Sequence, residues 1–152
     1  MQKRQRQIIT NFVVVITVTL VSVVAMINFK DMVNRSEAMR AMEALGRQVV
    51  AYREDYGAAP PESYVDRIRQ SLPGYARLGN LQYRARWIGF GSSDDTILAY
   101  ARKRYRSSFL EDGAVVLRLD GTVEWMEAGE FNALLQKQQT AEEIRMLKEQ
   151  LK

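Results

Sequence analysis

A segment without a charged side chain, IITNFVVVITVTLVSVVAMINF, runs from Ile8 to Phe29. About 20 residues of α-helix cover the roughly 30 Å hydrocarbon core of a bilayer, so this segment is long enough to cross a membrane. The sequence therefore predicts a transmembrane helix at residues 8–29. The residues that we assign to the anchor are Ile8, Phe12, Ile16, Leu20, Val24 and Phe29.

The flanking charges predict the orientation of this anchor. Lys3, Arg4 and Arg6 precede it without an acidic residue, whereas the charges that follow it cancel. By the positive-inside rule, residues 1–7 form a cytoplasmic basic head and the rest is exported. A cleaved signal peptide has a similar pattern, and Val23-Val24-Ala25 is a passable cleavage site. We prefer a retained anchor because the apolar run is longer than that of a signal peptide.

The composition argues against enzymatic chemistry. None of the 152 residues is cysteine or histidine. The chain therefore lacks the usual metal ligands, the usual general base at neutral pH and the usual base partner of a serine nucleophile. No pair of carboxylates stands out as an acid–base pair. We expect no catalytic residue, no cofactor, no resident metal and no small-molecule substrate.

The predicted helix continues beyond the membrane. Residues 30–56 contain no proline and form an amphipathic continuation, which Gly57 and Pro60-Pro61 end. Apolar residues recur there at steps of three or four, as on one face of a helix. This stripe consists of Met39, Met42, Leu45, Val49, Tyr52 and Tyr56. A helix with such a stripe needs an apolar partner.

Residues 57–126 predict a loop followed by a small antiparallel sheet. A short helix near Tyr64 to Ser71 precedes LQYRARWIGF, in which apolar and polar residues alternate as in a half-buried strand. Further strands are expected from Thr96, in AVVLRL and in TVEWM. Asp120-Gly121 lies between the last two and predicts a hairpin with a type I′ turn. The strand residues that we expect to face the helix are Trp87, Val116, Val123 or Trp125.

The fold class is therefore α+β: a long N-terminal helix packed on an antiparallel meander of three or four strands, with a C-terminal helix. That last helix is predicted at residues 127–152, where Thr140 and Glu143 form a capping-box pattern.

Basic residues on the predicted strands have two interpretations. They are contacts for a partner or for an anionic polymer such as DNA, or they are edge charges that prevent sheets from associating, which we prefer. Asp94 and Asp95 lie in a Gly/Ser loop and are either part of a calcium site or, in the interpretation that we prefer, a solvated turn. The basic residues concerned are Arg84, Arg86, Arg102, Lys103, Arg104 and Arg106.

A basic head, an apolar segment, one long helix and a small antiparallel sheet together resemble the type IV pilins and, more closely, the pseudopilins of type II secretion. GAVVLRLDGTVEWMEAGEFNALL is similar to the end of many pseudopilin-like proteins, and YREDYGAAPP resembles the end of their long helix. The resemblance implies a non-enzymatic, single-pass protein of the bacterial inner membrane with a periplasmic or other extracytoplasmic domain. Its implied partners are the bilayer and subunits of a secretion or pilus-type assembly, copies of itself included.

Two positions of the apolar segment depart from that family, as does Thr122 after the Asp-Gly turn, where histidine is frequent. Asn11 stands where a glycine precedes the peptidase cleavage site, and Ile16 stands where a glutamate lies inside the apolar run. The resemblance therefore implies a pilin-like protein that keeps its N-terminus and has left filament building. The alternative function is an envelope-anchored module that binds an anionic polymer through its basic strands.

Overall fold

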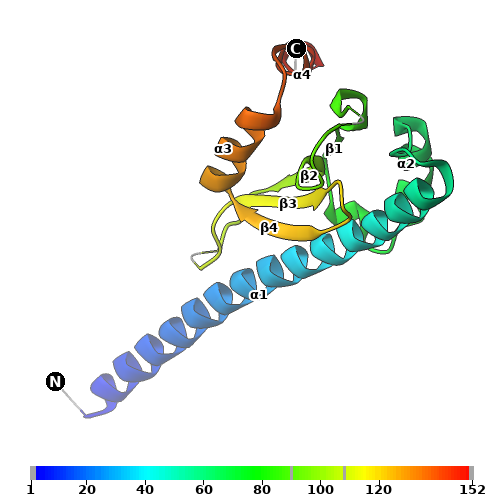
Figure 1. The fold of residues 1–152 in the computed structure, drawn as a ribbon. Coiled ribbons are helices and arrows are strands. Elements are labelled where there is room, and N and C mark those ends of the chain that lie inside the picture. The colour runs from blue at the N-terminus through cyan, green and yellow to red at the C-terminus, as the bar shows by residue number, and fades with distance from the viewer. Residues whose placement is uncertain (1–2, 90, 108, 151–152) are drawn as a thin grey trace.

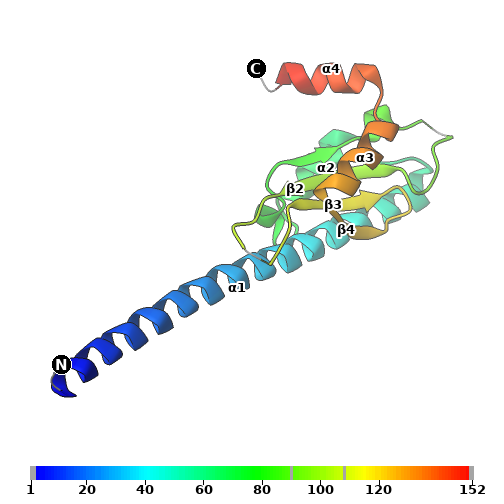
Figure 2. The ribbon, with the colours of Figure 1, turned by 90° about the vertical axis from the view of Figure 1, so that its left-hand side faces the viewer.

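The computed structural model describes residues 3–89, 91–107 and 109–150, and its fold is α+β (Figure 1). The long helix α1 (Lys3–Tyr56) lies across one face of a four-stranded antiparallel sheet. Helix α3 (Ala128–Gln138) lies on the other face, and α4 (Ala141–Gln150) stands apart from the sheet (Figure 2). The short helix α2 (Glu62–Arg69) follows α1. The predicted fold class is thus confirmed.

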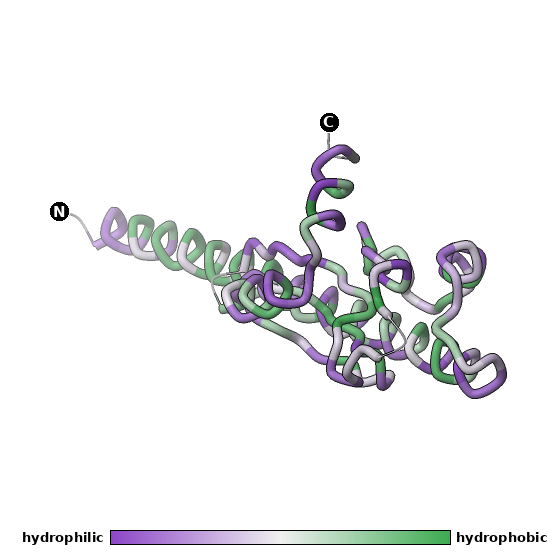
Figure 3. The backbone as a smooth tube through the Cα atoms, turned by 45° about the horizontal axis from the view of Figure 1, so that its top comes forward, coloured by the Kyte–Doolittle hydropathy of each residue, from purple (hydrophilic) through white to green (hydrophobic). Residues whose placement is uncertain are grey.

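Helix α1 has two halves with different surroundings. Its 54 residues extend about 80 Å at 1.5 Å per residue. The first half is apolar and projects from the domain, and the second half packs on the sheet (Figure 3). Gly57 ends the helix with φ 72°, and its N–H donates to the Arg53 carbonyl at 2.8 Å. This left-handed residue is the usual helix terminator, as the sequence predicted.

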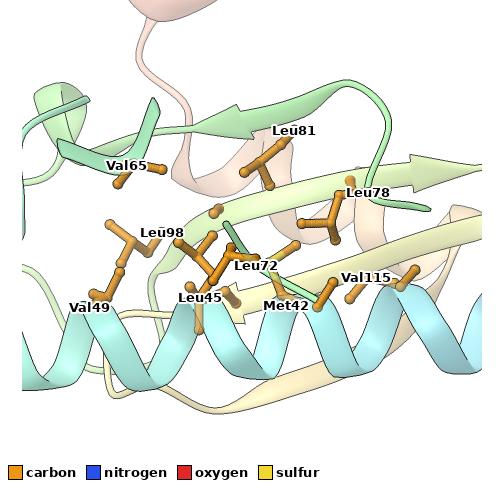
Figure 4. Close-up of a cluster of buried hydrophobic side chains, with 14 of the residues drawn as sticks. Met42, Leu45, Val49, Val65, Leu72, Leu78, Leu81, Leu98 and Val115 are labelled. Carbon is orange, nitrogen blue, oxygen red and sulfur yellow. The ribbon is translucent and has the colours of Figure 1, made fainter. Parts of the chain in front are cut away.

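The second half of α1 supplies one side of the main core. Met42, Leu45 and Val49 are fully buried and point toward Leu98 and Val115 of the sheet (Figure 4). The predicted stripe is therefore right at its centre. At its ends Met39 and Tyr52 are only partly buried, and Tyr56 is 70% exposed, so its assignment to the buried stripe was wrong. Residues from α2 to the first strand close the cluster from the side, among them Val65, Leu72, Leu78 and Leu81.

The sheet is a meander in the order β1-β2-β3-β4, with every pair antiparallel. Its strands are β1 (Leu81–Tyr83), β2 (Ile97–Lys103), β3 (Gly113–Arg118) and β4 (Val123–Glu127). Of the four residues expected to face α1, Val123 and Trp125 pack against its cluster. Val116 was assigned to the wrong face, because it lies in the second cluster with Phe131 and Leu135 of α3. Trp87 lies outside both clusters.

Asp120 and Gly121 do form the β3–β4 turn, but the turn is not type I′. Only glycines among the described residues have positive φ, so Asp120 does not, while Gly121 has φ 91°. The Gly121 N–H donates to the Arg118 carbonyl at 3.0 Å, and the Arg118 N–H donates to the Thr122 carbonyl at 2.8 Å. This is the three-residue loop that ends in a left-handed glycine.

Two predicted elements are shorter than expected. Strand β1 ends at Tyr83, and Ala85–Trp87 forms a single 3₁₀ turn, so the predicted strand through LQYRARWIGF was too long. The single C-terminal helix expected at residues 127–152 is two helices, because Gln139 between them is extended with ψ 138°.

Candidate functional site

The most extensive candidate surface is the apolar first half of α1. The six residues assigned to the anchor have exposed fractions between 43% at Ile16 and 66% at Phe12. The three threonines of this segment bond within the helix, since the hydroxyls of Thr10, Thr17 and Thr19 donate to carbonyls four residues earlier at 2.9 Å. Such internal pairing is what hydrocarbon surroundings require. Helix α1 is thus long and apolar enough to span a membrane, as a single-pass protein needs.

The β2–β3 loop, the residues between Lys103 and Gly113, reaches α1 where the apolar segment ends. The backbone N–H groups of Arg106 and Ser107 donate to Oδ2 of Asp31 at 3.0 and 2.9 Å. The Ser107 hydroxyl also bonds Oδ1 of Asn28. Phe109, in the same loop, is 80% exposed. No periodicity marks a loop, so sequence reasoning did not find this contact.

An open apolar groove lies beside this loop. Phe109 lines it on one side, and α1 lines it on the other. The α1 residues are Leu20, Val21, Val24, Ala25 and Asn28. The loop therefore extends the apolar surface of the anchor instead of covering it.

Tyr105 holds the start of the loop against the domain. Its ring lies 5.6 Å from the ring of Trp125, and its N–H donates to Oδ1 of Asp112 at 2.8 Å. The guanidinium of Arg35 stacks on the same Trp125, 4.3 Å from the centroid of its ring. Burial raises the pKa of the Tyr105 hydroxyl to about 12. The loop is thus fixed at its base by packing and on α1 by hydrogen bonds.

Arg84 is not on the solvent face where its strand position predicted it. It is 3% exposed, and its Nε and Nη2 donate to the two carboxylate oxygens of Glu143 at 2.7 and 3.0 Å. Its remaining bonds go to the carbonyls of Ile97 at 2.7 Å and Gln138 at 3.0 Å. An arginine with these partners is closed to an external polymer, so its assignment as a contact residue was wrong.

The other predicted basic contacts are dispersed over the surface. Arg102 donates to Oδ1 of Asn132 at 2.8 Å, and its guanidinium stacks 4.8 Å from the Phe131 ring. Lys103 is half-buried and donates to the Arg77 carbonyl. Burial, together with the charge of Arg77, lowers the pKa of Lys103.

Four of the six basic residues keep exposed side chains: Arg86, Arg102, Arg104 and Arg106. Arg86 stacks 4.8 Å from the ring of Trp87 near the end of β1, whereas Arg104 and Arg106 lie in the β2–β3 loop. The structure therefore spreads the predicted set over the residues after β1, the end of β2 and the β2–β3 loop, and only Arg104 and Arg106 lie in the loop that contacts α1.

The acidic loop is organised by its own chain. The Ser93 hydroxyl bonds Asp95, while the Asp94 carbonyl accepts the Asp120 N–H at 3.1 Å. Across the residues that the structure describes, no three acidic side chains gather where a metal ion would bind. The two carboxylates are exposed.

Comparisons of the sequence with protein-family models and with curated proteins, and of the structure with solved structures, found no match.

Proposed function

We propose that this chain is a non-enzymatic, membrane-anchored, pilin-like component of a secretion or pilus-type assembly. One observation carries the proposal: a single unbroken helix buries one half in a sheet domain and exposes its other, apolar half. Such a helix offers lipid, or neighbouring helices within lipid, a surface about 20 residues long while holding the domain rigidly beyond it. The anchor and the ends of the helix then make the contacts with the other subunits of the assembly.

The charge pattern supports an orientation for this component. The basic residues Lys3, Arg4 and Arg6 favour a cytoplasmic N-terminus, and the sheet domain of the proposed component is then periplasmic. Asn11 and Ile16 favour a protein that keeps its anchor without peptidase processing. Its partners are subunits of the assembly, copies of this chain included.

The state of the N-terminus tests the retained anchor. Intact-mass measurement of protein extracted from membranes should give the full chain, or the full chain without Met1. A new N-terminus at Phe12 would instead show a processed pseudopilin, and one at Met26 would show a secreted soluble domain. Either result would contradict a retained anchor.

An anchor exchange tests the assembly role. The full-length protein, tagged at its C-terminus, is purified from membranes in mild detergent and the associated proteins are identified. The matched control replaces residues 8–29 by an unrelated apolar segment of equal length, which keeps the domain at the membrane. We expect subunits of an envelope assembly with the native anchor and their loss with the control. If neither protein brings such subunits, the proposed role is wrong.

The alternative, a module that binds an anionic polymer, has its own test. Salt-sensitive binding of the protein to DNA fragments of unrelated sequence would favour it. The burial of Arg84 and the internal bonds of Arg102 and Lys103 reduce the basic surface for such binding.

A further inference from the structure

We propose that the β2–β3 loop is a second membrane contact, in which Phe109 inserts into the lipid beside α1 and the exposed arginines of the loop face the phosphate headgroups. The inference rests on the membrane insertion of α1, which is part of the proposed function, and is independent of the assembly role.

The first argument is the depth of Phe109 along α1. Lys30 is the first charged residue after the apolar segment, and Phe109 shares a groove with Val21 and Val24. Val24 lies six residues before Lys30, which is about 9 Å along the axis. When α1 spans a bilayer with Lys30 among the headgroups, the Phe109 side chain therefore lies at the level of the acyl chains.

The second argument is that the loop is held there. Asp31 accepts the N–H groups of Arg106 and Ser107, and the Ser107 hydroxyl accepts those of Phe109 and Leu110 at 3.0 and 3.2 Å. These bonds satisfy four backbone donors of the loop, in two adjacent pairs, close to the proposed membrane surface. An apolar ring that is 80% exposed is thus presented on a closed, hydrogen-bonded support.

The third argument is the order of side chains along the membrane normal. Arg104 and Arg106 are exposed in the same loop, and the Arg106 backbone lies at the level of Asp31. Basic groups beside the headgroups with an aromatic ring below them are the arrangement of proteins that sit at a bilayer surface. Lipid is the occupant that we infer, because the groove continues the lipid-exposed surface of the anchor without interruption.

Because the chain has no cysteine, a single introduced cysteine reports on one position. The full-length Phe109→Cys variant, labelled with an environment-sensitive fluorophore, is reconstituted in vesicles of phosphatidylcholine and phosphatidylglycerol. Brominated acyl chains in the same vesicles quench a probe that reaches them. Val21→Cys is the control inside the anchor, and Gln136→Cys, exposed on α3, is the control in water.

We expect quenching at position 109 to approach that at position 21 and to exceed that at position 136 severalfold. Quenching at 21 without quenching at 109 would overturn the inference and leave the anchor intact. Absence of quenching at both would overturn the anchor itself and the inference with it. Crosslinking of position 109 to a second copy, without quenching by lipid, would assign the groove to another subunit.

The arginines have a separate test in the same vesicles. A double variant, Arg104→Glu and Arg106→Glu in the labelled Phe109→Cys protein, should show less quenching at position 109, because the reversed charges repel the phosphatidylglycerol headgroups. Arg86→Glu, an exposed arginine that is not in the loop, is the matched control and should leave quenching unchanged. Equal quenching in the labelled parent protein, the double variant and the Arg86→Glu control would mean that Arg104 and Arg106 do not take part in the membrane contact.

Discussion

Two glycines determine how closely α1 approaches the β3–β4 hairpin. Gly46 is buried in the middle of α1, and a Cβ atom there would lie 3.0 Å from Cδ1 of Leu117 and 3.2 Å from the Gly121 carbonyl. A Cβ atom on Gly121 would lie 2.5 Å from Cγ2 of Val50. Alanine is the better helix former by about 1 kcal/mol, so close packing explains the glycine inside this helix.

Replacing Gly46 with valine should push the helix away from the hairpin. Overpacking of this kind costs about 1–3 kcal/mol, which we expect as a lower unfolding temperature of the full-length protein in detergent. Gly129→Ala is the control, because a Cβ atom at that helical glycine meets nothing within 4 Å. It should keep or slightly raise stability. Equal unfolding temperatures for the two variants would mean that the helix and hairpin are farther apart.

Replacing Gly121 with valine combines a strained backbone with a steric clash. A β-branched residue at φ 91° is strained, and Val50 blocks its side chain, so the combined loss should be on the order of a few kcal/mol. Gly57→Val separates the two causes, because Gly57 has φ 72° with open space around it. It should cost less in the same thermal unfolding measurement. Unchanged stability of Gly121→Val would show that this turn is not formed.

At the scale of elements, a buried ion pair connects α4 to the sheet domain. Glu143 is 1% exposed and binds Arg84, and Gln139 donates to the same carboxylate at 3.4 Å. The Thr140 hydroxyl accepts the Glu143 N–H at 3.2 Å, so half of the predicted capping box is present. The carboxylate that would complete the box goes to Arg84 instead. The pair thereby connects the helix cap to the end of β1.

Replacing Glu143 with alanine should release α4 and leave Arg84 without its carboxylate. Removing one member of a buried pair costs roughly 3–5 kcal/mol. We expect faster amide hydrogen exchange throughout α4 and a lower unfolding temperature. Glu142→Ala removes an exposed neighbour on the same helix and should change neither. If both variants exchange at the same rate, something other than the ion pair holds α4.

The errors of sequence reasoning at this scale have physical causes. The alternation of the strand predicted that Arg84 is exposed. Its carboxylate partner, Glu143, lies 59 residues further along the chain, and no local pattern reveals such a partner. Val115, Val116 and Leu117 are all buried, since α1 covers one face of β3 and α3 the other. A strand that is buried on both faces does not alternate between apolar and polar residues. The apolar run of β3 therefore could not show which of its residues faces α1. The strands themselves were predictable because turn residues separate them.

At the scale of the whole molecule, α1 is one helix with two different halves, one exposed and apolar and the other buried on the sheet. The boundary lies where Asn28 and Asp31 bind the β2–β3 loop, and the apolar surface before it has no protein partner among the described residues, apart from that loop. The apolar run and the stripe made both halves predictable, because each has a clear pattern. The loop contact between them joins residues 75 to 79 positions apart and leaves no local signal.

Deleting residues 1–29 should leave a soluble, folded domain that keeps the outer half of α1. That half is held by packing on the sheet, because an isolated helix of this length is marginal in water. Circular dichroism should therefore show a helical, cooperatively unfolding protein.

In this soluble form Leu45→Asp should unfold the domain, since Leu45 is fully buried and an unpaired charge would enter the core. Arg47→Asp places the same charge on the exposed face of the same helix and should fold normally. If Leu45→Asp also folds normally and loses only its partners, the stripe is an exposed interaction surface. The packing of α1 on the sheet would then be wrong, and with it the structural basis of the proposed function.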